Sequence, residues 1–252
     1  MTRRPAAGSA PSTVNGGGSL SVAAPNLPCE AGEGDREAVE GTSRRVVDAA
    51  SFAAAARATE QQVADLRRFL ELLTAGNAVM NLVGPATIPD FWNRHAWDSA
   101  QLLRLAPEAR TWADLGAGAG FPGLVLAILA KGQAGAHVHL VESMAKRCRF
   151  LDSVVAGLGL PATVHHTRAE NLTLSVDIVT ARACAPLHRL LGYARPYLSA
   201  GAVGLFLKGQ DAVEDMREAA RYWEYEADVI PSLSDGRGRI VRVRRLGRAR
   251  KV

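Results

Sequence analysis

The sequence has few cysteines, few aromatic residues and no long hydrophobic run. Its three cysteines, Cys29, Cys148 and Cys184, are too scattered for a disulfide framework or a paired metal site. The longest apolar stretch, Phe121–Ala130, is about half the length that a transmembrane helix requires. Small and polar residues follow Arg3 and Arg4, where a signal peptide would have an apolar block. We therefore expect a soluble, reduced, cytoplasmic protein with no bound metal.

The overall composition, with 48% hydrophobic and 22% charged residues, is typical of a globular protein. The net charge of +5 is unevenly distributed, because residues 237–251 contain eight basic residues and no acidic one. A dense positive end suits a polyphosphate such as a nucleic acid. A solubilising tail or a basic edge strand that prevents aggregation would leave the same pattern.

The first part of the chain divides into two segments. Residues 1–45 are rich in Gly, Ala, Ser and Pro and have no periodic apolar face, which predicts disorder. Residues 46–110 are predicted to form a small helical module. Val63, Leu66, Leu70 and Leu73 recur at helical spacing, and Gly76-Asn77 supplies an expected stop.

A second helix of this module is predicted to begin near Thr87-Ile88-Pro89-Asp90, where proline and an acid follow a threonine. Its apolar stripe contains Phe91, His95, Ser99 and Leu102. Two amphipathic helices make a poor core alone, so we expect the module to pack against the segment that follows.

From residue 111 onwards, strand-like and helix-like segments alternate, which predicts a parallel sheet covered on both faces. The expected strands are 111–115, 137–141, 162–165, 177–181 and 203–207, and the expected helices are 124–131, 145–157, 186–198 and 212–223. Residues 229–230 and 239–244 flank a glycine-rich turn and predict an antiparallel edge hairpin. The expected fold is thus an α/β domain over residues 111–246 with a mostly parallel seven-stranded sheet, followed by a basic tail at 247–252.

The most informative segment is the turn between the first strand and the first helix of this domain. It contains Gly116, Gly118 and Gly120 at alternate positions, so its backbone can turn sharply and approach a ligand closely. Asp114 precedes the turn, and Glu142 ends the second strand, near the spacing at which a carboxylate receives ribose hydroxyls. The pattern predicts a nucleotide-like ligand.

Two ligand classes fit this pattern. A nicotinamide dinucleotide binds to similar turns, but an acid beside the turn would repel its pyrophosphate. The same acid suits the cationic amine of S-adenosylmethionine, and no Gly-Lys-Ser/Thr follows that would indicate a triphosphate loop. The residues favour the methyl donor over the dinucleotide without excluding either.

The turn resembles the cofactor loop of the bacterial RsmG (GidB) family, whose members methylate N7 of a guanine in 16S ribosomal RNA. Further segments resemble the signatures of this family in order and at similar spacing, over about residues 50–244. These segments are Asn81-Leu82, Arg94-His95-Ala96-Trp97-Asp98-Ser99, Glu142-Ser143-Met144-Ala145-Lys146-Arg147, Thr180-Ala181-Arg182-Ala183 and Leu207-Lys208-Gly209.

The resemblance implies a class I, Rossmann-like methyltransferase that uses S-adenosyl-L-methionine. It implies donor-binding roles at the turn and the second strand for Gly116, Gly118, Gly120, Phe121 and Glu142. Asp114 is expected to bind the donor through its charge, because it lies beside the turn. The resemblance also implies that Ala169-Glu170 meets the adenine end of the cofactor and that Arg182 lies at the edge of the same pocket. We expect Arg182 and His95 to be the catalytic residues.

Guanine N7 carries an in-plane lone pair and no proton, so its methylation needs no general base. We therefore expect positioning rather than proton transfer, with Trp97, Phe121 or Arg182 as the plane that stacks on the base. The expected RNA-binding residues are Arg94, Lys208, Arg242, Arg244 and Arg245.

The expected partner is 16S ribosomal RNA or the small ribosomal subunit, bound by a monomer. Two other functions stay open on the residues alone. One is a nicotinamide-dependent reductase, although Tyr193 and Tyr197 lack a lysine four residues later. The other is a non-catalytic RNA-binding or assembly protein that uses the basic end.

Overall fold

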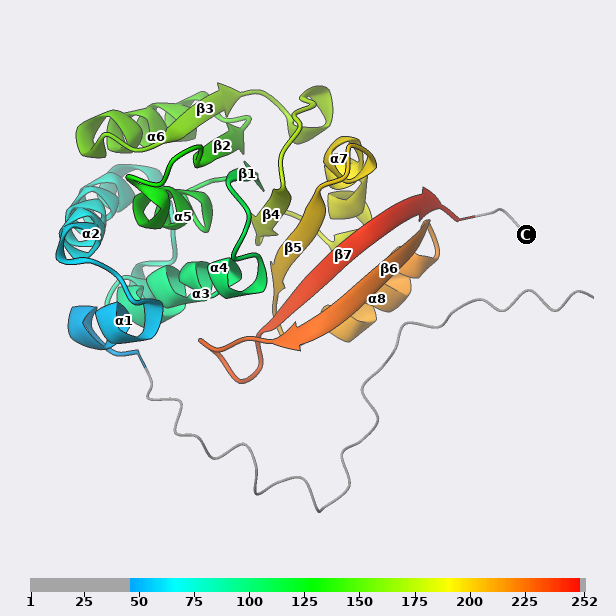
Figure 1. Cartoon of the computed structure of the whole chain (residues 1–252), viewed down its shortest axis with the longest axis horizontal. Helices are drawn as coiled ribbons and strands as arrows, with labels where there is room; N and C mark the ends of the chain where they lie inside the picture. Colours follow the sequence, from blue (N-terminus) through cyan, green and yellow to red (C-terminus); the bar gives the residue numbers. More distant parts are fainter. Residues whose placement is uncertain (1–45, 250–252) are drawn as a thin grey trace, which may run out of the picture.

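The computed structural model describes residues 46–249 as a sheet with helices on both faces (Figure 1). The predicted disordered segment 1–45 lies outside the described residues. The sheet has seven strands in the order β3-β2-β1-β4-β5-β7-β6. Strands β1 to β5 pair in parallel, and β7 pairs antiparallel with both β5 and β6. This arrangement confirms the predicted class I, Rossmann-like sheet with an antiparallel edge hairpin.

The strands and the helices that connect them alternate as predicted. The strands are β1 (Thr111–Leu115), β2 (His137–Glu142), β3 (Ala162–His166), β4 (Ile178–Arg182), β5 (Val203–Lys208), β6 (Trp223–Pro231) and β7 (Arg239–Arg248). The helices are α5 (Gly123–Ala130), α6 (Ala145–Leu158), η4 (Ala169–Asn171), α7 (Leu187–Ser199) and α8 (Ala212–Ala220).

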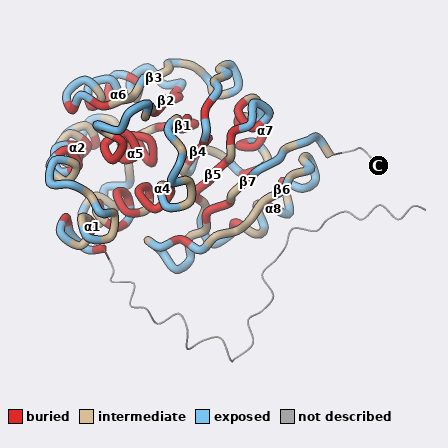
Figure 2. Tube along the Cα trace, viewed as in Figure 1, coloured by how far each residue is buried: buried red, intermediate tan, exposed pale blue. Residues whose placement is uncertain are grey.

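Two hydrophobic cores lie on opposite faces of the sheet. One core contains the apolar residues of α5 and α6, together with Trp112 from β1. The other contains α7 and α8 together with Ala113 and Leu115, from the same strand as Trp112. Trp112 and its neighbour Ala113 lie on opposite faces because the side chains of a strand alternate with a two-residue period. Every residue of α5 is buried, so this helix forms the centre of the first core (Figure 2).

The helical module packs on the first core and shares it with the sheet. It contains α1 (Ala49–Ala56), α2 (Glu60–Met80), η2 (Pro85–Thr87), the π-helical segment η3 (Phe91–Trp97), α3 (Asp98–Ala100) and α4 (Leu102–Leu105). Phe69 of α2 contacts the rings of Phe91 and Phe121. Asp65 of α2 is buried and pairs with Lys131 at the end of α5, at 2.9 Å. The module is therefore attached by both apolar and ionic contacts.

The predicted helix stop at Gly76-Asn77 is wrong, because α2 continues to Met80. Gly76 marks a close approach of two helices instead: a Cβ there would lie 3.0 Å from the Phe150 ring of α6. Asn77 is buried, and its side-chain oxygen accepts a hydrogen bond from the Val83 N–H. The helix ends at Asn81, which adopts the left-handed conformation.

The hairpin is longer than predicted. Strand β7 extends through Gly247 and Arg248, which pair with β6 and so do not belong to a separate tail. Val241 and Val243 of β7 are buried, and they alternate along the strand with Arg242 and Arg244. None of the helices in the described part of the chain is long and apolar enough to cross a membrane.

We expect Phe69→Ala to destabilise the protein strongly, because it removes a buried ring that joins the helical module to the sheet. The expected loss is about 3–5 kcal/mol in the free energy of unfolding, measured by urea denaturation. Val79→Ala is the matched control on the same helix, because Val79 is 80% exposed; its effect should stay within about 0.5 kcal/mol. Equal losses in the two variants would contradict the shared core.

Candidate active site

The glycine turn lies at the carboxyl end of β1, where α/β sheets bind their ligands. Gly116, Gly118 and Gly120 all have positive φ, at 67°, 56° and 95°. A Cβ on Gly116 would lie 2.7 Å from the Cys184 sulfur, and one on Gly120 would collide with the Leu124 side chain. Side chains are therefore disfavoured at these positions, and the turn presents bare backbone to the space in front of it.

Two buried carboxylates hold the turn in place. Glu142, at the end of β2, accepts hydrogen bonds from the N–H groups of Gly118 (3.0 Å) and Met144 (2.8 Å). Asp114, in β1, accepts a hydrogen bond from the Gly123 N–H through Oδ2, at 2.8 Å. Its other oxygen, Oδ1, is buried without a hydrogen-bond partner among the described residues. Burial raises the pKa of Asp114 to about 7, although the Gly123 hydrogen bond and Arg182 lower it.

Arg182 ends β4, beside β1, and its guanidinium group is held from several sides. The group lies over the Phe121 ring, with 4.7 Å between the guanidinium carbon and the ring centroid. Nη1 donates to the Arg94 carbonyl oxygen at 2.9 Å and lies 3.4 Å from a carboxylate oxygen of Asp98. Nη2 donates to Nδ1 of His95 at 2.9 Å. Stacking and hydrogen bonds therefore fix the plane of this cation.

His95 stacks on Phe121, with 4.6 Å between the ring centroids, and is buried. An arginine can only donate, so Nδ1 of His95 is the acceptor and the ring proton is on Nε2. Nε2 then donates to the Thr87 hydroxyl at 2.9 Å. Burial, assisted by the positive charges of Arg182 and Arg94, lowers the pKa of His95 to about 3. The imidazole is therefore neutral and orients Arg182.

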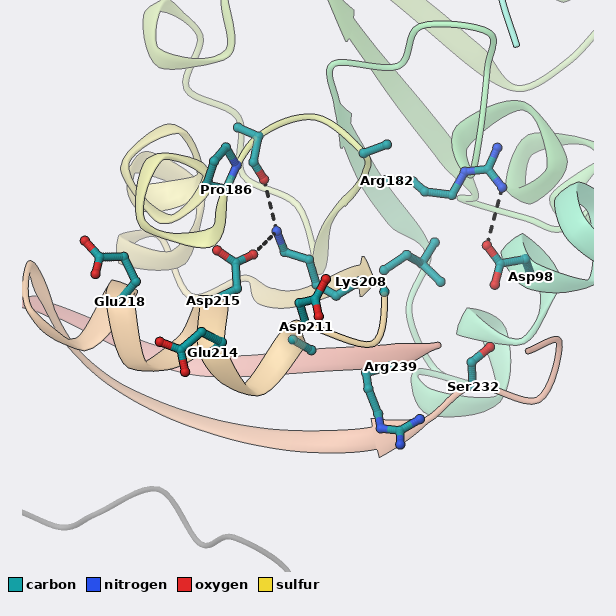
Figure 3. A pocket seen from close by; sticks show the side chains of 15 residues that line it. Asp98, Arg182, Pro186, Lys208, Asp211, Glu214, Asp215, Glu218, Ser232 and Arg239 are labelled. Atoms are coloured by element: carbon teal, nitrogen blue, oxygen red, sulfur yellow. Dashed lines mark hydrogen bonds and ion pairs between the residues drawn. The ribbon is translucent and has the colours of Figure 1, made fainter. Parts of the chain in front are cut away.

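Gly116, Gly118, Phe121, His95 and Arg182 line one cleft of about 750 Å³. The predicted site residues Asp114, Gly120 and Glu142 are not among its lining residues. Much of its wall comes from the glycine turn with Phe121, the segment 82–98, and the loop between β6 and β7. Arg182, Ala183, Lys208 and Gly209 line it from the ends of β4 and β5. A second cleft of about 640 Å³ shares Arg182 with the first and is lined by carboxylates of α8 (Figure 3).

The structure does not bring every predicted site residue into the cleft. Ala169 and Glu170 lie in η4, outside its lining; Ala169 packs against the second core, and Glu170 is exposed beside Arg168. Trp97 is buried, and its indole N–H donates to the Leu233 carbonyl oxygen at 3.3 Å. Trp97 therefore cannot stack on a base in the cleft. Of the three predicted planes, Phe121 and Arg182 line it.

Most of the cationic side chains predicted to bind RNA form ion pairs with carboxylates of the protein. Lys208 pairs with Asp215 at 2.6 Å, as Figure 3 shows. Arg242 and Arg244 share Asp228, at 2.7 Å each. The remaining two, Arg245 and Arg94, are more accessible: Arg245 is only loosely paired with Glu226, and Arg94 forms no ion pair within the described part of the chain.

Arg147 was not predicted as a site residue, but it lines the cleft, 3.9 Å from Glu142. Its position on the first turn of the helix that follows β2 was the available signal. Thr87 and Ser234 also line the cleft and were not predicted. Nothing in the local sequence around them indicates a site, because their partners lie in other segments.

The fold and the cleft define a class I methyltransferase. A family model described as "rRNA small subunit methyltransferase G" (GidB) matches residues 62–239. A Ribosomal RNA small subunit methyltransferase G of Caulobacter vibrioides is 63% identical over 81% of this chain and 95% of the relative. One of Methylorubrum populi is 50% identical over 71% and 87%. The chain therefore belongs to the rRNA small subunit methyltransferase G family.

Among solved structures, the chain is similar to cofactor-bound Rv0187 from MTB, with a TM-score of 0.50 and 16% identity. The similarity covers 72% of this chain and 90% of that one. It supports the fold assignment.

We expect His95 to stay neutral, with its proton on Nε2, from pH 5 to 8. Its nitrogen chemical shifts in a two-dimensional NMR spectrum report both the charge and the tautomer. The control is His166, which is exposed and does not contact Arg182. An imidazolium signal from His95 at pH 6 would contradict the orienting role.

Proposed function

We propose that this protein transfers the methyl group of S-adenosyl-L-methionine to N7 of a guanine in 16S ribosomal RNA. Family membership supports the methyltransferase activity. The observation that carries the proposal is a cleft lined by the glycine turn and the stacked Arg182, with the buried carboxylates Asp114 and Glu142 bonded to the backbone of the turn.

The residues present fit the methyl donor. Gly116, Gly118 and Gly120 carry no side chains, so the backbone of the turn is open to close approach by a ligand. Asp114 Oδ1 is a buried acceptor without a partner among the described residues, suited to a cationic amine. We propose that Gly116, Gly118, Gly120 and Phe121 hold the donor and that Glu142 receives its ribose hydroxyls. Ala169 and Glu170 are proposed for the adenine end, on the family resemblance alone. When bound, the cofactor supplies a methyl group on a positively charged sulfur.

The task of the chain is to position the guanine. N7 carries no proton that a base would have to remove, so proton transfer has no part in the step. Correct alignment of two reactants is worth on the order of 7–11 kcal/mol. The fixed plane of Arg182 offers a flat, hydrogen-bonding surface on which a base stacks. We therefore assign Arg182 the direct catalytic role and His95 the role of orienting it.

The alternatives find less support in the structure. A reductase would need an accessible acid at the hydride site, but the Tyr197 hydroxyl is buried in the second core and burial raises its pKa to about 12. A purely RNA-binding protein would not require the bare turn and the unpartnered carboxylate oxygen. We propose that the protein acts as a cytoplasmic monomer on the small ribosomal subunit or its RNA.

The direct test uses purified protein, isotope-labelled S-adenosylmethionine and 16S RNA, either free or in the small subunit. Mass spectrometry of the digested RNA should show one new 7-methylguanosine. A labelled base other than guanine, or no transfer to either substrate, would contradict the proposal.

Gly118→Asp should reduce the affinity for S-adenosylmethionine by at least about 100-fold, because a carboxylate would enter the space in front of the turn (~2.7 kcal/mol). The matched control is Gly132→Asp. Gly132 also has positive φ (83°), but a Cβ there would have no atom within 4 Å, and the residue lies away from the cleft. Both variants should lose about 1–2 kcal/mol of stability through backbone strain. Isothermal titration separates them, and equal affinities would contradict the pocket.

The affinity for S-adenosylmethionine should rise about tenfold from pH 5.5 to 7. The pKa of Asp114 is raised to about 7, so the carboxyl is largely protonated at pH 5.5 and gains charge as the pH increases. The donor's amine stays charged over this range. Asp114→Asn should bind more weakly and with little pH dependence. An unchanged pH profile in that variant would show that Asp114 does not meet the amine.

Arg94→Ala should weaken RNA binding and reduce the slope of log affinity against log salt by about 1, because one phosphate contact is lost. The main-chain carbonyl that holds Arg182 remains. Arg217→Ala is the control, since Arg217 is an exposed cation of α8 paired with Glu214. Fluorescence anisotropy at several salt concentrations measures both slopes. Equal slopes for Arg94→Ala and wild type would place the RNA elsewhere.

A further inference from the structure

One face of the segment 93–101 has no role in the proposed function, but its polar side chains form hydrogen bonds with another part of the chain. It faces the loop between β6 and β7, residues 232–238, which lies more than 130 positions away in the sequence. Asn93 donates to the Ser234 carbonyl oxygen (3.0 Å), and Gln101 accepts from the Leu233 N–H (2.7 Å). Gln101 also donates to the Ser232 hydroxyl (3.0 Å).

This loop is a defined structure. The Ser232 N–H donates to the Gly238 carbonyl oxygen, and the Gly238 N–H donates to the Asp235 carbonyl oxygen, at 3.0 and 2.8 Å. Asn93 and Gln101 are less than a tenth exposed. Breaking these hydrogen bonds would leave buried polar groups without partners, which carries a large free-energy penalty. The loop is therefore held firmly against the helix. Four of its residues line the cleft of the glycine turn.

Asp98 connects this loop to Arg182. Its Oδ1 accepts a hydrogen bond from the Ser234 hydroxyl at 2.6 Å, and its Oδ2 lies 3.4 Å from Nη1 of Arg182. Figure 3 shows the carboxylate and the guanidinium facing each other at the edge of the second cleft. The Asp98 and Arg182 side chains are each 18% exposed, which makes the charge interaction stronger than a surface ion pair.

We propose that Asp98 is a positioning residue that holds Arg182 and the loop 232–238 at a fixed separation, so that they form two walls of the slot for the target base. The inference rests on the proposed function, since it assigns the slot to a planar base of the RNA. Asp98 acts through the two groups that its carboxylate contacts, Arg182 and Ser234.

The geometry explains why a single carboxylate is suited to this task. Each of its oxygens serves a different wall, so a shift of either wall disturbs the other. Without the Asp98 charge, Nη1 of Arg182 keeps only the Arg94 carbonyl and Nη2 only His95, so the guanidinium is held less firmly on Phe121. Misplacement by about 1 Å costs on the order of 100-fold in rate.

The test compares Asp98→Asn, Ser234→Ala and the double variant with wild type. At saturating donor, we expect kcat for 16S RNA to fall about 10–100-fold in Asp98→Asn and less in Ser234→Ala. KM for RNA and the affinity for the donor should stay within about threefold of wild type. Because both changes break one connection, the double variant should be no slower than Asp98→Asn.

Asp65→Asn is the control for a merely structural role. Asp65 is also a buried carboxylate paired with a cation, but it lies between α2 and α5. It should lower the melting temperature and leave kcat of the folded protein unchanged. If Asp98→Asn behaves like Asp65→Asn, losing activity only with its folded fraction, the positioning role is wrong; Ser234→Ala decides the matter should Asp98→Asn not fold.

A second readout is independent of catalysis. The Nη–H signals of Arg182 in NMR spectra of the free protein should be slow to exchange with solvent in wild type and faster to exchange in Asp98→Asn, because Asp98 contacts Nη1. Unchanged exchange would overturn the inference. If wild type transfers no methyl group to 16S RNA, the proposed function fails, and this measurement still decides whether Asp98 positions Arg182.

Discussion

The arrangement of the cleft depends on how the Arg182 guanidinium is held. This cation emerges from the end of β4 and lies on Phe121, which follows the glycine turn of β1. His95 and the Arg94 carbonyl hold it from the helical module, and Asp98 links it to the hairpin loop. Three segments that are distant in the sequence therefore meet at one group, the planar Arg182 guanidinium. Since the module shares its hydrophobic core with the sheet, packing and site geometry depend on each other.

Methyl transfer requires little of the protein beyond the correct positions of these groups. A lone pair on guanine attacks a methyl group that is already activated by the positive charge on the donor's sulfur. No side chain therefore has to gain or lose a proton. The structure is consistent with that requirement: His95, which lines the cleft, is neutral and serves as a hydrogen-bond acceptor for Arg182. The acids near the turn have other tasks. Glu142 holds the backbone of the turn, and Asp114 keeps one buried oxygen without a partner among the described residues.

Much of the fold was predictable because buried strands are visible in the sequence. The five parallel strands lie within one residue of their predicted bounds, since apolar runs bounded by polar turns define them. Strand β6 was largely missed: Trp223 was assigned to the preceding helix and residues 224–228 to no element, because a half-exposed edge strand has no apolar run. The end of α2 was missed because Gly76 serves a helix contact, which only the tertiary structure reveals.

The site was predictable to the extent that its residues belong to the strand ends. The turn, Glu142 and Arg182 follow from strand positions and from the family resemblance. The pairing of Lys208 with Asp215 and the bonds of Trp97, Asp98 and Ser234 depend on contacts between distant segments, which no local pattern encodes.

The most direct test of the proposed donor site is a crystal structure of this protein with S-adenosylhomocysteine, the demethylated form of the donor. We expect density along the backbone of residues 116–120, with the ligand's amine at Asp114 Oδ1 and Arg182 still lying on Phe121. A ligand bound elsewhere, or a turn closed against it, would contradict the central claim.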